Sequence, residues 1–226
     1  ELRRRILFED DKLLVLDKPS GLAVHLGSGL SISVIDCLDG MYPNDTIHLA
    51  HRLDRFTSGC LLCAKSIGVL RQLQKAFKSG LVQKHYLALV RHAWQVRDFE
   101  VCFNLAKQML RGGERVSRVR EGGQPALSVF STQRVWSQVS LMRVQIATGR
   151  THQIRVHAAE SGHPIVGDSK YGDREFNRTM AEFGVKRLFL HAQGLQIHQD
   201  VLGRGYEFLA KLPEDLRHCI KKLDAA

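Results

Sequence analysis

The chain has 226 residues, of which 44% are hydrophobic and 25% are charged, so it can bury the core of one large or two small globular domains. No apolar run reaches the ~18–20 residues of a membrane-spanning helix, and no signal peptide is recognisable. The five cysteines form an odd, scattered set, which is typical of reduced thiols rather than of a disulfide framework. This composition argues against membrane-spanning and disulfide-stapled classes and predicts a cytoplasmic protein.

The positive charge is concentrated in one part of the chain. The net charge is +10, but residues 52–155 carry 18 Lys and Arg against 5 Asp and Glu, a net charge of +13. The rest of the chain is slightly acidic, with a net charge of −3. Such a concentration of cations predicts a polyanionic partner, most simply a nucleic acid. A membrane surface is the less favoured partner, because no basic amphipathic helix with an aromatic face stands out.

The first fifth of the chain predicts a hairpin and a short helix. Apolar residues 6–8 and 13–16 flank an acidic turn, and the second of these strands ends at Lys18-Pro19-Ser20-Gly21. Residues 31–36 open a helix that Tyr42-Pro43 ends.

Strands dominate the remainder of the chain. The predicted strands are residues 60–64, 86–90, 99–105, 115–119, 127–135, 139–147, 188–197 and 206–208. The predicted helices cover positions 69–77 with Gly80 as C-cap, 151–160, 174–183 and 213–223, and Gly112-Gly113 and Gly122-Gly123 mark turns. Because strands outnumber helices and mostly follow one another directly, we predict an α+β fold with a mixed, mainly antiparallel sheet flanked by helices. Residues 1–226 contain no repeat and no linker, and are predicted to form one compact domain.

The stretch His51-Arg52-Leu53-Asp54-Arg55-Phe56-Thr57-Ser58-Gly59 sets one carboxylate among several cations. Opposite charges within ~4–6 Å lower the pKa of an aspartate by about 1–3 units, so Asp54 is expected to be ionised. An ionised carboxylate in a polar loop suits nucleophilic attack better than proton donation. For an arbitrary aspartate, a helix N-cap or a surface ion pair is the commoner role.

Two further polar clusters lie in the basic segment. In Lys84-His85-Tyr86, the tyrosine opens a strand, where it belongs to the core more often than to a site. Its alternative role is to stack on a nucleobase, which is worth ~1–3 kcal/mol. Residues 148–157 place Arg150, Thr151 and Gln153 at the start of a predicted helix, where they form either a phosphate or carboxylate site or a solvated basic helix start.

A metal site is the weakest of the candidate sites. His48 and His51, together with Cys60 and Cys63, have spacings compatible with zinc. However, the cysteines belong to a predicted strand, on which residues three apart point to opposite faces. We therefore predict no metal and no cofactor.

Several separated motifs occur in the order found in the RluA-type pseudouridine synthases and resemble that family. They are Lys18-Pro19-Ser20-Gly21, residues 51–59, Gln83-Lys84-His85-Tyr86, residues 149–157, residues 163–168 and residues 188–192. The resemblance extends from about residue 6 to about residue 213. It implies the pseudouridine synthase catalytic fold and an enzyme that flips a uridine out of RNA and isomerises it to pseudouridine without a cofactor.

The resemblance also implies roles for individual residues. Asp54 would be the nucleophile, Tyr86 would stack on the target base and take part in removing the C5 proton, and Arg155 would pair with the catalytic aspartate. The implied substrate-binding residues are Arg52, which would enter the gap left by the flipped uridine, Leu190, which would pack against the uracil, and Arg150. His51, Thr57 and Gly59 would shape the catalytic loop.

Two stretches narrow the expected substrate. Residues 26–30 and 171–176 resemble a member of the family that acts on 23S, large-subunit, ribosomal RNA. A transfer RNA synthase of the same family and a non-catalytic RNA-binding module are the alternatives. Family members usually carry a small S4-like RNA-binding domain ahead of the catalytic domain. Because the chain begins with Glu1 rather than Met, we expect that domain to be missing here, and we expect a monomer.

Overall fold

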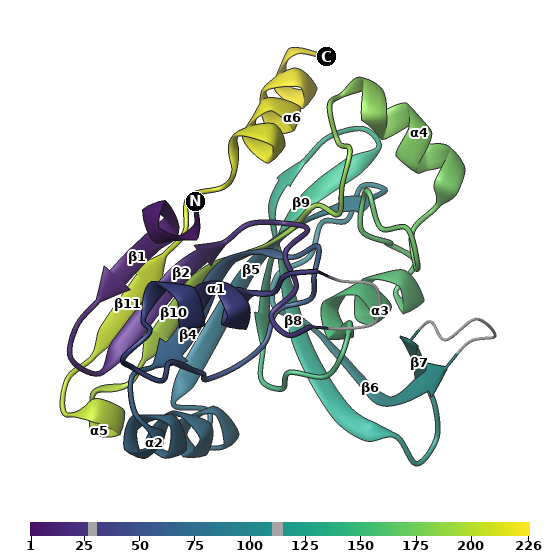
Figure 1. The fold of residues 1–226 in the computed structure, drawn as a ribbon. Coiled ribbons are helices and arrows are strands. Elements are labelled where there is room, and N and C mark those ends of the chain that lie inside the picture. The colour runs from purple at the N-terminus through teal and green to yellow at the C-terminus, as the bar shows by residue number, and fades with distance from the viewer. Residues whose placement is uncertain (27–30, 110–114) are drawn as a thin grey trace. The chain divides into compact units, whose positions relative to one another are not determined.

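The computed structural model describes residues 1–26, 31–109 and 115–226 (Figure 1). The predicted turn at Gly112-Gly113 and most of the 26–30 stretch lie outside these residues. In the described part of the chain, no helix combines the length and the apolar character needed to cross a membrane.

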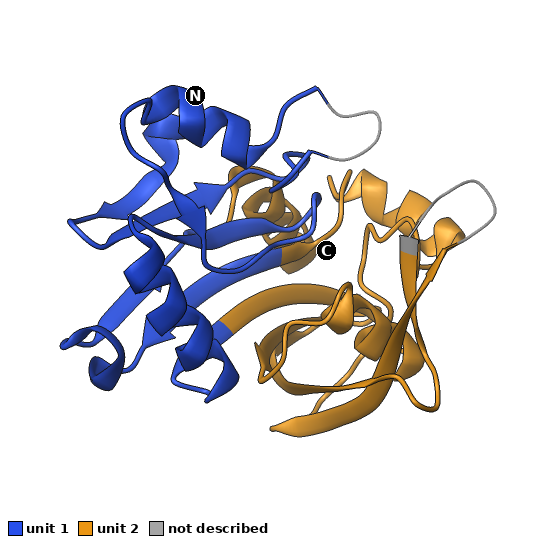
Figure 2. Ribbon diagram, turned by 60° about the horizontal axis from the view of Figure 1, so that its bottom comes forward, with its two compact units in different colours: residues 1–84, 191–211 blue, residues 85–190, 212–226 orange. Residues whose placement is uncertain are grey.

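The described residues form two compact units, which Figure 2 shows in blue and orange. Unit 1 consists of Glu1–Lys84 and His191–Lys211, and unit 2 of His85–Leu190 and Leu212–Ala226. The chain crosses between the units three times, twice within strands, at residues 84–85 and 190–191, and once between a strand and a helix, at residues 211–212. Both units lie within the range predicted as one catalytic domain, and that assignment stays a prediction.

Unit 1 is built on strands in the order β1-β2-β4-β10, with β3 beside β4 and β11 beside β10. Its strands are β1 (Ile6–Glu9), β2 (Leu13–Lys18), β3 (His48–Leu49), β4 (Ser58–Ala64), β10 (Leu190–Ile197) and β11 (Tyr206–Leu209). Its helices are a 3-10 turn (Leu2–Arg5), α1 (Val34–Met41), α2 (Ile67–Lys78) and α5 (Gln199–Leu202). Within the unit, β10 runs parallel to β4, and the pairings β1-β2, β2-β4, β3-β4 and β10-β11 are antiparallel.

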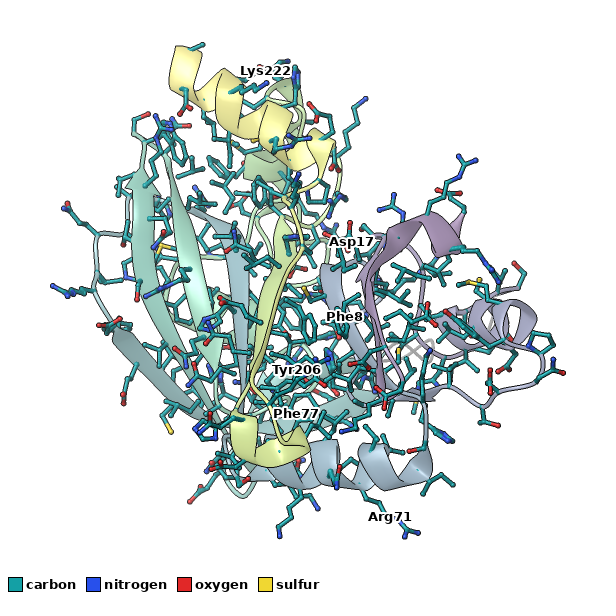
Figure 3. All side chains as sticks on the ribbon, turned by 90° about the vertical axis from the view of Figure 1, so that its left-hand side faces the viewer. Phe8, Asp17, Arg71, Phe77, Tyr206 and Lys222 are labelled. Atoms are coloured by element: carbon teal, nitrogen blue, oxygen red, sulfur yellow. The ribbon has the colours of Figure 1, made fainter. Side chains whose placement is uncertain are left out.

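The core of unit 1 forms around β4, whose seven residues are all buried. A strand covered on both faces has a continuous apolar sequence rather than an alternating one, as residues 60–64 do. Phe8 and Tyr206 pack edge to face with ring centroids 5.9 Å apart, and both are labelled in Figure 3. Helix α2 buries Leu73 and extends Arg71 away from the unit (Figure 3).

Unit 2 is an antiparallel ladder in the order β5-β9-β8-β6-β7. Its strands are β5 (Val82–Arg91), β6 (Phe99–Met109), β7 (Arg115–Val119), β8 (Gln124–Val135) and β9 (Val139–Ile146). Its helices are α3 (Gln153–Glu160), α4 (Arg174–Glu182) and α6 (Glu214–Ala225). One core cluster packs Leu89, Phe189 and Met180 with Cys219 and Leu223 of α6.

The predicted α+β fold with its mainly antiparallel sheet is confirmed. The elements that the sequence did not predict are short, namely β3, α5 and the 3-10 turn. Several predicted helix ends also differ by a few residues, including those of α2 and α3. Ser79 caps α2 and Gly80 follows it with φ +74°. Helix α3 begins at Gln153 rather than at residue 151, because His152 adopts the left-handed conformation, with φ 55° and ψ 21°.

A buried histidine makes the stability of unit 2 dependent on pH. His157 on α3 is fully buried, and neither of its ring nitrogens has a hydrogen-bond partner among the described residues. Its ring packs edge to face on Phe103, with centroids 5.6 Å apart. Burial lowers the pKa of His157 to about 4, because the charged imidazolium loses its hydration.

This environment predicts an acid-sensitive free energy of unfolding. Between pH 6.5 and about pH 4 the unfolded chain binds a proton at residue 157 that the folded chain does not, so stability falls as the pH falls. The exchange His157→Leu removes this effect. In urea unfolding at pH 7, 6 and 5, the wild type should lose up to about 1.4 kcal/mol per pH unit relative to the variant. The exchange His218→Leu, at an exposed position, is the control. The prediction is contradicted if the difference in unfolding free energy between the wild type and His157→Leu is the same at pH 7 and pH 5.

Candidate active site

The loop that carries Asp54 is tied to the turn after β2 by a buried lysine. Lys18 is fully buried, and its Nζ donates to the carbonyl oxygens of Pro19 at 2.8 Å, Leu22 at 2.8 Å and Arg55 at 3.1 Å. A buried ammonium needs such acceptors, because an uncompensated buried charge is strongly unfavourable. Lys18 therefore fixes the backbone immediately after Asp54.

Three more hydrogen bonds join the same two segments. The Ser20 hydroxyl donates to the carbonyl of Phe56 at 2.7 Å, and the N–H of Gly21 donates to the carbonyl of Arg55 at 2.9 Å. In return, Nε of Arg55 donates to the carbonyl of Gly21 at 2.9 Å. The motifs 18–21 and 51–59, which lie far apart in the sequence, thus form one rigid substructure of unit 1.

Asp54 and Arg52 differ in exposure within this loop. Asp54 is half-buried, and its carbonyl accepts the N–H of Thr57 at 3.1 Å, which closes a tight turn. Arg52 is exposed. The loop therefore presents a partly shielded carboxylate beside an accessible guanidinium.

The strand after the loop is anchored by a buried histidine. Nε2 of His191 donates to the carbonyl of Ala210 at 3.1 Å, so Nδ1 is the acceptor of a hydrogen bond from the Ser58 hydroxyl at 2.9 Å. Next to Ser58, Gly59 has φ +109°, and a Cβ there would lie 2.2 Å from the carbonyl oxygen of Ala192. Only glycine allows β4 and β10 to approach so closely.

His51 has a structural role in the same substructure. Its Nε2 accepts the N–H of Leu62 at 3.0 Å, and its ring packs on Phe77. Burial and the nearby Lys84 ammonium lower the pKa of His51 to about 3, so it stays neutral and keeps this hydrogen bond. That His51, Thr57 and Gly59 shape the catalytic loop stays a prediction.

In unit 2, Arg155 forms a buried two-point ion pair. Its Nε donates to Oδ2 of Asp168 at 2.7 Å and its Nη2 to Oδ1 at 2.8 Å, and both side chains are almost completely buried. Burial by itself would raise the pKa of Asp168, but the Arg155 contacts and the N–H groups of Lys170 and Tyr171 bring it below its ordinary value. The carboxylate is therefore ionised, and the guanidinium has a fixed orientation.

The start of α3 is used for structure rather than as an open anion site. Gln153 is buried, and its amide donates to the carbonyl of Leu127 and to the Ser128 hydroxyl at 2.9 and 3.0 Å. Its Oε1 accepts from the Thr148 hydroxyl and from the N–H of Arg150. Gln153 thus joins α3 to β8, while the half-exposed Arg150 donates from Nε to the carbonyl of Pro125 at 3.2 Å.

The other predicted site residues of unit 2 lie on strands. Tyr86 is 6% exposed in β5, opposite Val144 of β9. Leu190 is 3% exposed at the start of β10. Among the predicted site residues, Asp54 and Arg52 belong to unit 1, and Tyr86, Arg150, Arg155 and Leu190 belong to unit 2.

The two cysteines considered as zinc ligands are buried. Burial raises the pKa of both Cys60 and Cys63 to about 12, so both are protonated thiols near neutral pH. Within the described ranges, no group of three or more His, Cys, Asp or Glu side chains is arranged to hold a metal ion.

Two residues of these substructures were not predicted as site residues. Lys18 was named only within the 18–21 stretch, as a turn signal and as one of the family motifs, and Asp168 only as the last residue of the 163–168 stretch. A lysine that ends a strand of buried apolar residues was the one available signal for Lys18. No sequence pattern paired Asp168 with Arg155, because they lie 13 residues apart and meet only through the fold.

A family model described as RNA pseudouridylate synthase matches residues 12–160. The chain is 45% identical over 223 residues to the ribosomal large subunit pseudouridine synthase C of Haemophilus influenzae, covering 98% of this chain and 69% of that protein. It is 46% identical over 221 residues to the protein of the same name from Escherichia coli strain K12, covering 96% and 69%.

A solved structure gives the same result at the level of the fold. The human RNA pseudouridylate synthase domain containing 4 superposes with a TM-score of 0.80 at 26% identity, covering 99% of this chain and 94% of that chain. The matched residues 12–160 include the Lys18 substructure, Asp54, Tyr86 and Arg155. The chain belongs to the RNA pseudouridylate synthase family.

Proposed function

We propose that this protein converts specific uridines of large-subunit ribosomal RNA into pseudouridines, with Asp54 as the nucleophile. The names and the high identity of the bacterial relatives support this RNA as the substrate. The charge of +13 on residues 52–155 suits a polyanionic partner. The free thiols of the five cysteines support a reducing compartment, the cytoplasm, as the place of action.

The observation that carries the catalytic proposal is the way the Asp54 loop is held. Lys18 and the hydrogen bonds between residues 20–21 and 55–56 fix the backbone on one side of Asp54, and the Thr57 turn closes the loop. A nucleophile benefits from such preorganisation, because misplacement by about 1 Å can cost on the order of 100-fold in rate. A module that only binds RNA has no use for a rigidly held anion facing phosphates.

The proposed reaction needs no co-substrate, because it rearranges one nucleotide. The Asp54 carboxylate attacks the target nucleotide at the sugar or the ring, and the N1–C1′ bond breaks. The uracil turns, its C5 forms the new bond to C1′, and the bond between Asp54 and the nucleotide breaks, which regenerates the carboxylate. The proton on C5 leaves and N1 gains a proton, so atoms and electrons balance. Tyr86 is proposed to stack on the base and to assist in the loss of the C5 proton.

The arginines have different roles in this proposal. Arg155, oriented by Asp168, is proposed to pair with the catalytic carboxylate in the complex with RNA. Arg52 is exposed and can enter the gap that the flipped uridine leaves in the base stack. Arg150 and Leu190 are proposed to contact the substrate as a phosphate ligand and as an apolar surface for the uracil.

The exchange Asp54→Asn should abolish isomerisation while leaving RNA binding intact, because it removes the nucleophile and keeps the shape of the side chain. We expect the release of tritium from RNA labelled at uridine C5 to slow by about 10³-fold or more. Binding of the same RNA, measured by filter retention, should change less than about threefold. Asp45→Asn, at an exposed position of unit 1, is the matched control. Turnover by Asp54→Asn within about tenfold of the wild type would rule out the proposed nucleophile.

The substrate is tested by mapping pseudouridines in cells that lack the protein. Large-subunit ribosomal RNA should lose specific pseudouridines, and these should return when the gene is restored but not when the Asp54→Asn form is supplied. If ribosomal RNA keeps all its pseudouridines and a transfer RNA loses one, the substrate is transfer RNA instead.

A further inference from the structure

Tyr171 covers the guanidinium of Arg155. The centre of the Tyr171 ring lies 5.1 Å from Cζ of Arg155, in the geometry of a cation–π contact. The N–H of Tyr171 donates to Oδ1 of Asp168 at 3.1 Å, and this oxygen also binds Arg155. One carboxylate thus orients the guanidinium directly and positions the residue that covers it.

The hydroxyl of Tyr171 holds the ring in place at its far end. It accepts the N–H of Ser117 on β7 at 2.7 Å and lies 2.8 Å from Nδ1 of His152. Since Ser117 is the donor in the first contact, the hydroxyl proton remains available for the imidazole nitrogen. His152 is the left-handed residue that precedes α3, the helix that carries Arg155.

The backbone around Tyr171 allows little adjustment. Gly172 follows it, and a Cβ at that position would lie 2.3 Å from the carbonyl oxygen of Asp168. The N–H of Gly172 donates to the same carbonyl oxygen at 3.2 Å. The turn 168–172 is therefore tight and requires glycine, so the direction of the Tyr171 side chain is set by the backbone as well as by its hydroxyl.

We propose that Tyr171 is a positioning residue that holds the Arg155 guanidinium in the orientation that catalysis requires. Asp168 fixes the guanidinium within its plane through two hydrogen bonds, and the Tyr171 ring restricts motion out of that plane. The inference rests on the proposed catalytic role of Arg155. It assigns a function to the 171–176 stretch, which lies beyond the residues matched by the family model.

The experiment distinguishes the contribution of the Tyr171 ring to kcat from that of its hydroxyl. Tyr171→Phe keeps the aromatic face over Arg155, whereas Tyr171→Leu removes it. For isomerisation of protein-free large-subunit ribosomal RNA, Tyr171→Leu should lower kcat by about tenfold or more and change KM less than about threefold. Tyr171→Phe should keep kcat within about threefold of the wild type. The matched control is Tyr42→Leu, which removes a tyrosine ring 5.8 Å from the Lys65 ammonium in unit 1 and should leave kcat unchanged.

A second measurement distinguishes positioning from a general effect on folding. In an Arg155→Lys background, kcat should already be low, and Tyr171→Leu should lower it little further, because the guanidinium to be positioned is gone. Equal losses in both backgrounds would overturn the inference and leave the role of Arg155 intact. Normal kcat for Arg155→Lys would instead overturn the proposed role of Arg155, and the inference with it.

A third measurement does not require the Tyr171→Leu variant to fold. Phenylalanines with an increasing number of ring fluorines keep the shape of the side chain and weaken the negative face of the ring. When these replace Tyr171, kcat should fall stepwise with fluorination at constant KM. Constant kcat across the series would contradict the proposal.

Discussion

The buried ion pair between Arg155 and Asp168 is the contact that joins helix α3 of unit 2 to the 168–172 turn. Removing a guanidinium and a carboxylate from water costs several kcal/mol per ion, and only close geometry with additional hydrogen bonds offsets it. Here two parallel N–H···O bonds join the ions. The Asp168 carboxylate also accepts hydrogen bonds from the N–H groups of Lys170 and Tyr171. The 168–172 turn and helix α3 are thereby fixed relative to each other.

In unit 1, backbone carbonyl oxygens accept hydrogen bonds from a buried cation. The Lys18 ammonium is as deeply buried as Arg155, and it donates to the carbonyl oxygens of Pro19, Leu22 and Arg55. A charge-assisted hydrogen bond to each carbonyl stabilises the cation and fixes the backbone that supplies it. Each unit therefore uses one buried cation to make a loop rigid. In unit 1 that loop carries Asp54, and in unit 2 the buried cation is itself a proposed catalytic group.

The sequence predicted the fold better than it predicted these contacts, for a physical reason. The buried strand 60–64, the hairpin 6–16 and the helix with apolar positions 69, 70, 73 and 77 follow from periodicity, which local sequence contains. The ion pair of Arg155 depends on an aspartate 13 residues later, and the ammonium of Lys18 on a carbonyl 37 residues later. Such partners follow no period. The left-handed His152 was equally unpredictable, because the bonds of Gln153 and Tyr171 that surround it come from other elements.

The central claim is that Asp168 is what makes a buried, oriented Arg155 possible, and a double-mutant cycle on stability tests it most directly. The free energy of urea unfolding is compared for the wild type, Asp168→Asn, Arg155→Met and the double variant. Asp168→Asn should cost about 3–5 kcal/mol, because it leaves the guanidinium buried without its counter-ion. The double variant should recover a large part of that loss, since no buried cation remains. A double variant whose loss equals the sum of the two single losses to within about 0.5 kcal/mol would contradict the account.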